Sequence, residues 1–186
     1  KAGKSIPDST VEQLDRIGKR HLKENYLIAT RLIIGPGTPT KQLQESAEIS
    51  RTSIINPMTL QKLVELEAKY PGSINLIELK PYLVPGQSDS KIDEYIEKVQ
   101  DCIKLRSHIV QLVKTYQEKT GNERVSVHSL HGAYAISNPP QPLKPEKLHE
   151  ILVELSSPLT GYLGRNEESD WQRDRFYFLR DLDVEP

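Results

Sequence analysis

Glu78 and Lys80, spaced as Glu-x-Lys, are the first candidates for chemistry in this 186-residue chain. They follow a largely apolar run, 74–77. At the end of a strand, a carboxylate can hold a divalent metal while a nearby ammonium group orients the water that attacks a phosphodiester. Because Pro71 and Pro81 interrupt this segment, the same triplet also suits a short amphipathic helix.

The segment 35–41, Gly-Pro-Gly-Thr-Pro-Thr-Lys, lies where a phosphate-binding loop would lie, between a predicted strand and a predicted helix. Such a loop needs glycine before its lysine and serine or threonine after it, but Thr40 and Gln42 occupy these positions. Pro36 and Pro39 each remove an N–H donor. We therefore expect a strand-to-helix turn here rather than a nucleotide site.

His128 and His131 are three residues apart and could share one face of a helix. No cysteine or further histidine stands near them at the spacing of a zinc site. We expect ordinary surface or packing histidines at these positions, and we assign no metal ligands to the residues of this chain.

Basic side chains are densest near the start of the chain. Lysine and arginine on one helix face can displace counterions from DNA phosphates, and such binding weakens as salt rises. A solvated helix face explains the same pattern equally well. The residues that we consider for DNA contact are Lys4, Arg16, Lys19, Arg20 and Lys23, together with Lys144 and Lys147 of a later helix.

The first part of the chain has the hydrophobic pattern of an α/β fold. Helices are predicted over 10–24, 39–50 and 57–70, and strands over 26–34 and 52–56. The helix between the two strands implies a right-handed crossover and parallel strands. Two strands are too few for a complete sheet.

The second part has a mainly helical pattern after a connector at residues 71–90. We expect a long helix from about Ser90 to Gly121, a short strand leading into a helix over 125–135, a helix from Pro145, and strands around 159–165 and 175–180. Two strands joined by a loop after three helices describe a winged helix. We therefore predict an α/β domain over 1–84 and a winged-helix domain over 85–186.

Composition places the chain among ordinary globular proteins and excludes several classes. The net charge is −1, but residues 1–84 carry 12 basic against 9 acidic residues and the remainder 13 against 17. No run of 18 apolar residues suggests a membrane span. The single cysteine, Cys102, cannot form an internal disulfide, so we expect a reducing, cytoplasmic environment.

The first 70 residues resemble the closing half of a restriction-endonuclease-like nuclease domain of the PD-(D/E)xK fold. The resemblance lies in the order of elements: a link over 1–7, a helix with Lys19-Arg20-His21, the strand 26–34, the helix 42–50, and the strand 53–56 leading into 58–70. The segments 157–165 and 175–181 resemble a winged helix appended to such a nuclease.

The resemblance implies a magnesium-dependent DNA endonuclease with DNA as its partner. In that family the link follows the strand that carries the catalytic Glu-x-Lys, which makes Lys1 a candidate for the catalytic lysine and the Glu78 triplet a decoy. The metal-binding carboxylates would precede Lys1. We therefore expect a fragment that is inactive alone, with a second chain carrying the N-terminal half. The alternative is a non-catalytic winged-helix module that binds DNA or a protein.

Overall fold

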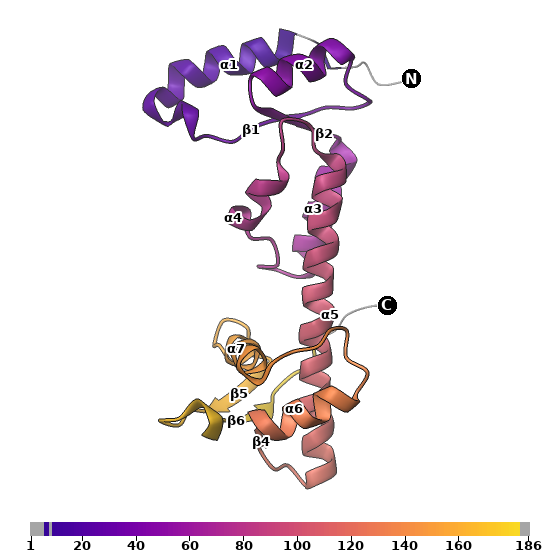
Figure 1. The fold of residues 1–186 in the computed structure, drawn as a ribbon, viewed down its shortest axis with the longest axis vertical. Coiled ribbons are helices and arrows are strands. Elements are labelled where there is room, and N and C mark those ends of the chain that lie inside the picture. Colours follow the sequence, from indigo (N-terminus) through magenta and orange to yellow (C-terminus); the bar gives the residue numbers. More distant parts are fainter. Residues whose placement is uncertain (1–5, 8, 183–186) are drawn as a thin grey trace. The chain divides into compact units, whose positions relative to one another are not determined.

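The computed structural model describes Ile6, Pro7 and residues 9–182 of the chain (Figure 1). The fold is mixed α/β, with helices predominating over two small sheets. The chain divides into two compact units, unit 1 over 1–99 and unit 2 over 100–186. In the described residues we find no helix with the length and apolar character that a membrane crossing requires.

Unit 1 contains a three-stranded sheet with the order β1-β2-β3. Strand β1 (Arg31–Ile34) pairs in parallel with β2 (Thr52–Ile55), and β2 pairs in parallel with the short β3 (Gly86–Gln87). Helix α2 (Lys41–Ile49) connects β1 to β2, so the predicted parallel pair with a helical crossover is confirmed.

Strand β1 is shorter than the predicted strand over 26–34. Residues Lys23–Leu27 form a 3-10 helix, η1, instead. The reason is that Tyr26 packs on α1: its hydroxyl donates to Asp15, and its ring lies where a Cβ on Gly18 would be only 3.0 Å away. The aromatic side chain that suggested a strand is therefore held by the helix before it.

Helices α1 (Ser9–Leu22) and α2 cover the same face of this sheet (Figure 1). Burial of apolar side chains between the two helices and the strands stabilises the arrangement. This core consists of Ile6, Val11, Ile33, Leu43, Ala47 and Ile54, with Leu14 packed against it. Gly35 lies in close contact with Ile6, where an added Cβ would be 2.3 Å from Ile6 Cγ1.

The remainder of unit 1 follows β2 along the chain. It comprises α3 (Pro57–Lys69), α4 (Leu76–Leu79), the 3-10 helix η2 (Lys80–Tyr82) and the first residues of α5 (Asp89–Thr120). The Asp89 carboxylate accepts hydrogen bonds from the Asn56 N–H, at 2.8 Å, and from the Thr59 hydroxyl. Asp89 thereby joins the start of α5 to the start of α3.

Helix α5 contributes to both units, because unit 1 ends at Val99 and the helix continues to Thr120. The predicted winged-helix range, 85–186, contains the whole of α5. The predicted connector at 71–90 contains α4, η2 and β3. The domain ranges that we inferred from the sequence stay a prediction.

Unit 2 combines α5 with two further helices and an antiparallel sheet of order β4-β6-β5. In chain order these are β4 (Val125–Ser126), α6 (Val127–Ile136), α7 (Pro145–Leu155), β5 (Leu163–Asn166), the 3-10 helix η3 (Trp171–Arg173) and β6 (Arg175–Phe178). Their core includes Ile109, Val113, Leu130, Tyr134, Leu148, Leu152 and Phe176. The predicted long helix and the later helices and strands are confirmed as elements, with shorter strands.

The β5–β6 pair tests how tightly unit 2 is packed. Gly164 faces Tyr177 across the pair, and a Cβ on Gly164 would lie 2.1 Å from Tyr177 Cζ. We expect Gly164→Ala to lower the free energy of unfolding by about 1–3 kcal/mol, because overpacking forces side chains and backbone to shift. Urea unfolding followed by the fluorescence of Trp171, the single tryptophan, measures this.

Gly132→Ala is the matched control, because a Cβ there meets nothing within 4 Å. It lies in α6, where alanine favours the helix by about 1 kcal/mol over glycine. Equal stability of the two variants would contradict the packing described for Gly164.

Candidate nucleic-acid interface

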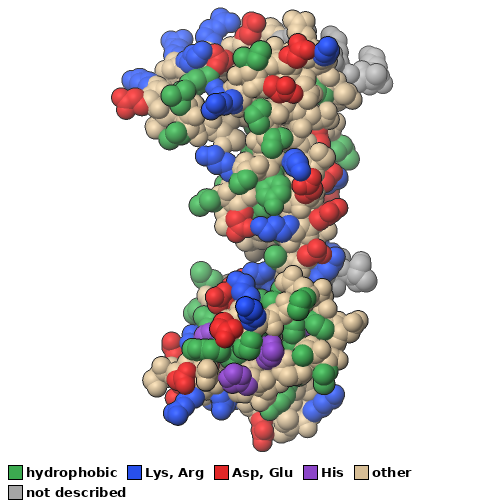
Figure 2. Space-filling view, viewed as in Figure 1, with side chains coloured by type: hydrophobic (Ala, Val, Ile, Leu, Met, Phe, Trp, Pro, Cys, Tyr) green, Lys and Arg blue, Asp and Glu red, His purple; other side chains and the backbone are tan. Residues whose placement is uncertain are grey.

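The outer face of α1 carries the first set of candidate DNA contacts. At 3.6 residues per turn, Arg16, Lys19 and Arg20 fall on one side of the helix, opposite the buried Val11 and Gly18. All three side chains are exposed. Figure 2 shows Lys and Arg side chains along this outer side, interspersed with Asp and Glu. We call Arg16, Lys19 and Arg20 the α1 basic face.

Asp15 lies beside this face and contacts three side chains, two basic and one phenolic. Lys19 Nζ is 2.7 Å from Asp15 Oδ2, and Arg31 Nη1 is 3.7 Å from Asp15 Oδ1. The Tyr26 hydroxyl donates to the same Oδ1. The Asp15 side chain is 27% exposed, so this carboxylate is within reach of solvent.

Arg31, the first residue of β1, packs against the ring of Tyr26. Its side chain is only 9% exposed, and its guanidinium carbon lies 4.6 Å from the centroid of the Tyr26 ring. Within the described residues, Arg31 Nε is buried without a hydrogen-bond partner. A buried cation needs a counter-charge, which Asp15 supplies. Asp15, Tyr26 and Arg31 therefore join α1, η1 and β1 through polar contacts.

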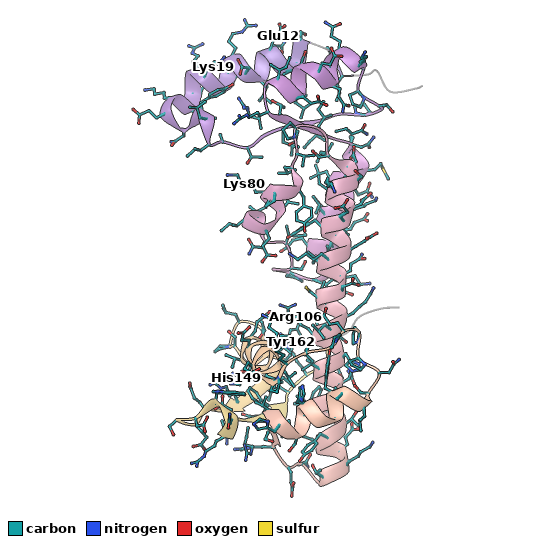
Figure 3. The ribbon with its side chains drawn as sticks, in the orientation of Figure 1. Glu12, Lys19, Lys80, Arg106, His149 and Tyr162 are labelled. Carbon is teal, nitrogen blue, oxygen red and sulfur yellow. The ribbon has the colours of Figure 1, made fainter. Side chains whose placement is uncertain are left out.

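The remaining candidates near the N-terminus differ in what the structure says of them. Lys1 and Lys4 lie outside the described residues. Lys23 is exposed at the start of η1, just after α1 ends. Figure 3 shows Glu12 and Lys19 on α1, on the side away from the strands. The structure thus brings Arg16, Lys19 and Arg20 onto one face, with Lys23 next to its end.

The second set of candidates, on α7 of unit 2, is closely accompanied by acidic side chains. Lys144 is exposed at the N-cap of α7. Lys147 Nζ lies 2.7 Å from Glu150 Oε2, and Glu146 is exposed beside it. The loop 167–170 between β5 and η3 adds two glutamates and an aspartate. This surface is a weaker match for a polyanion than the α1 basic face.

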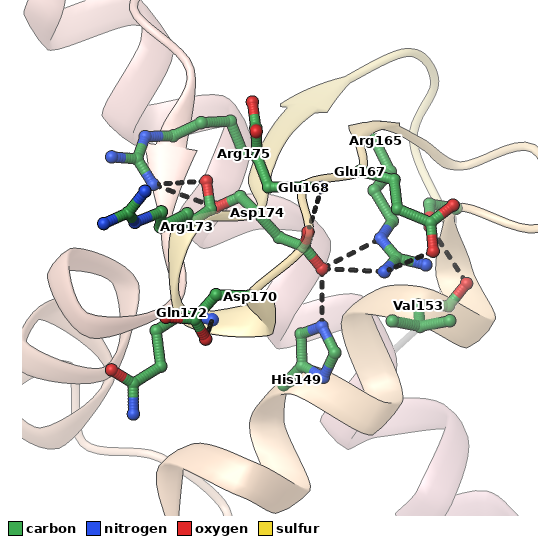
Figure 4. A network of polar contacts seen from close by, with 11 residues as sticks. His149, Val153, Arg165, Glu167, Glu168, Asp170, Gln172, Arg173, Asp174 and Arg175 are labelled. Atoms are coloured by element: carbon green, nitrogen blue, oxygen red, sulfur yellow. Dashed lines mark hydrogen bonds and ion pairs between the residues drawn. The ribbon is translucent and has the colours of Figure 1, made fainter.

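Asp174 makes hydrogen bonds both within the β5–β6 loop and to His149 of α7 (Figure 4). Its side chain is completely buried. Asp174 Oδ2 accepts from His149 Nε2 at 2.8 Å and from Arg165 Nη2 at 2.8 Å, and Oδ1 accepts from the Glu168 N–H at 2.9 Å. Trp171 lies against the same histidine, with ring centroids 5.1 Å apart.

Burial by itself would raise the pKa of Asp174, but the hydrogen bonds from Glu168, His149 and Arg165 outweigh it and lower the pKa below its usual value. The folded state therefore favours the ionised carboxylate. Its contribution to stability is complete above about pH 4 and is lost as the pH falls through the lowered pKa.

We expect Asp174→Asn to lower the free energy of unfolding by about 3–5 kcal/mol, because it leaves the Arg165 charge without its buried partner. Acid unfolding followed by Trp171 fluorescence should also lose the part of its pH dependence that Asp174 causes. Glu167→Gln is the control, since Glu167 also contacts Arg165, at 3.3 Å, but is 74% exposed. A similar loss in both variants would show that the buried carboxylate has no special role.

Glu78 and Lys80 do not form a strand-end pair. Glu78 lies in α4, where its Oε2 is 3.3 Å from Lys98 Nζ, and Lys80 begins η2 with its Nζ 3.5 Å from the Ile28 carbonyl oxygen. The alternative of a short helix is correct for Glu78, and Lys80 begins the 3-10 helix that follows.

The segment 35–41 forms a strand-to-helix turn, as predicted. The Thr40 hydroxyl accepts from the Leu43 N–H at 3.1 Å and so caps α2. The Gly35 N–H donates to the Ile55 carbonyl oxygen at 3.1 Å, continuing the pairing of β1 with β2. The Thr40 hydroxyl and the Gly35 N–H thus make hydrogen bonds within the protein itself.

The two histidines of α6 have separate surroundings. His131 Nε2 lies 2.9 Å from the Leu143 carbonyl oxygen, whereas the ring of His128 lies 6.1 Å from that of Trp171. Among the described residues, no group of three or more His, Cys, Asp or Glu side chains could hold a metal ion.

Sequence reasoning missed Asp15, Tyr26 and Arg31 at the α1 face and Asp174 and His149 as a pair. The four-residue spacing of Asp15 and Lys19 was a usable signal for the first group, because such residues are neighbours on a helix. No local pattern relates residues 15 and 31, or 149 and 174, because these contacts are made by the tertiary fold.

Comparison with protein-family models, with curated proteins and with solved structures found no match for this chain.

Proposed function

We propose that this chain binds the phosphate backbone of DNA through the α1 basic face. The observation that carries the proposal is the alignment of Arg16, Lys19 and Arg20 on the exposed side of a helix whose other side is fixed in the core. Lysine and arginine held in this way neutralise phosphates and release counterions. Backbone contacts of this kind position a protein on DNA without reading its sequence.

The helix dipole gives a second, structural reason for cations in the last turn of α1. It favours Lys19 and Arg20, which lie within about one turn of the C-terminal end. The dipole falls off over that distance and gives no reason for Arg16, which lies further from the end on the same face. Basic residues that only offset the dipole would be confined to the last turn. The presence of Arg16 on the same face therefore supports a phosphate-binding role for that face.

We also propose that unit 2 is a winged helix. The order α5, β4, α6, α7, β5, β6 with sheet order β4-β6-β5 supports this proposal. In that architecture α7 is the helix that would face a DNA groove. Since Lys147 is paired with Glu150 and the neighbouring loop is acidic, we infer that unit 2 makes the lesser contribution to DNA affinity and favours contact with a protein.

For the reaction, our proposal is magnesium-assisted hydrolysis of DNA by a restriction-type nuclease of which this chain is one part. Among the described residues no cluster of three or more His, Cys, Asp or Glu side chains could hold the metal, and in our proposal a second polypeptide with the N-terminal half supplies the carboxylates. Lys1, our candidate for the catalytic lysine, lies outside the described residues. What this chain would provide is the positioning of DNA.

The double variant Arg16→Gln/Arg20→Gln tests the DNA proposal. We expect weaker binding to duplex DNA of any sequence, and a salt dependence of the affinity that is shallower by about two units, one for each lost phosphate contact. Fluorescence anisotropy of a labelled duplex, titrated between about 50 and 200 mM salt, measures both quantities.

The control is Lys104→Gln/Lys119→Gln, which removes two exposed charges from α5. We expect its salt dependence to stay within half a unit or so of that of the parent chain. Equal losses in the two variants would attribute binding to net charge and would contradict a defined α1 interface.

A further inference from the structure

We propose that Asp15 occupies, in the free protein, the position that a DNA phosphate takes in the complex, and so sets the affinity of the α1 basic face. This inference rests on the proposed function. Asp15 would act as an internal competitor for the same donors, and the residue would be a determinant of DNA affinity rather than a contact to DNA.

The chemistry of the donors supports this reading. An ammonium group, a phenol and a guanidinium converge on the Asp15 carboxylate, from Lys19, Tyr26 and Arg31. Such donors also bind phosphate oxygens, because carboxylate and phosphate are both anionic acceptors. An anion that replaced Asp15 would therefore meet a suitable donor in Lys19, the most exposed of the three.

The exposure of the pair allows such an exchange. The Lys19 side chain is 64% exposed and the Asp15 side chain 27%, while Arg31 is almost completely covered. A partly exposed ion pair four residues apart on a helix shifts an equilibrium by only about twofold. A phosphate can displace Asp15 from Lys19 at that small cost, whereas Arg31 stays in place under Tyr26.

Glu12 provides a matched comparison on the same helix. It is exposed on the side of α1 that carries Arg16 and Lys19, as Figure 3 shows for Glu12 and Lys19. Within the described residues, no ion pair engages it. Replacing either acid by its amide removes one negative charge from α1, but only the change at Asp15 releases Lys19.

The test compares Asp15→Asn with Glu12→Gln in the full chain, using anisotropy of a labelled duplex. We expect about a twofold lower Kd for Asp15→Asn than for Glu12→Gln, because binding of a phosphate to Lys19 no longer requires the loss of its ion pair with Asp15. The amide oxygen of the Asp15→Asn variant can still accept from Tyr26, but the variant removes the counter-charge of the buried Arg31. Thermal unfolding checks that the fold is retained.

Lys19→Gln, made in the parent chain and in the Asp15→Asn variant, supplies a second measurement of the same competition. In the parent chain, where Lys19 must first leave Asp15, the substitution should weaken binding less than it does in the Asp15→Asn variant. In the Asp15→Asn background the same substitution should abolish the gain. An equal effect of Lys19→Gln in both backgrounds would overturn the inference.

The two proposals fail in distinguishable ways. If the Arg16 and Arg20 substitutions leave DNA affinity unchanged, the proposed function itself is wrong. If those substitutions weaken binding while Asp15→Asn binds no better than Glu12→Gln, only the role of Asp15 is wrong.

Discussion

The packing of α1 on the parallel pair of β1 and β2 is the constraint on which the account of this protein depends. Val11 faces the core that holds Ile33 and Ile54, and Gly18 faces the Tyr26 ring. Fixing one side of a helix fixes the other, because successive residues advance by a constant angle. The rotation of α1, and with it the direction of its basic residues, is therefore a consequence of apolar burial.

Each unit contains an aspartate that contacts several basic side chains: Asp15 in unit 1 and Asp174 in unit 2. The two carboxylates differ in how deeply they are buried. Asp174 is fully buried, and breaking its contacts with His149 and Arg165 would leave a charge inside the protein. Asp15 is partly open to water, so its contact with Lys19 can be exchanged for another anion. Asp174 stabilises a loop, while Asp15 is the one that we propose to affect DNA affinity.

The sequence was sufficient for most of the helices and strands, but it was insufficient for η1, for the third strand β3 and for the polar contacts. Hydrophobic periodicity located α2, α3 and α5 and the parallel strands, because these elements are specified by local pattern. It assigned Tyr26 to a strand, because an aromatic residue before an apolar run favours a strand. In the structure Tyr26 instead packs against Asp15 and Gly18 of α1. The contacts of Arg31 and Asp174 join residues far apart in the chain and could not be read from spacing.

Hydrogen–deuterium exchange of the chain with and without duplex DNA tests the central claim, that α1 is the DNA-binding element, most directly. The account predicts slower exchange over α1 and η1, residues 9–27, and little change over α7 and the loop that follows β5. Protection confined to α7 and that loop, with none in α1, would contradict it.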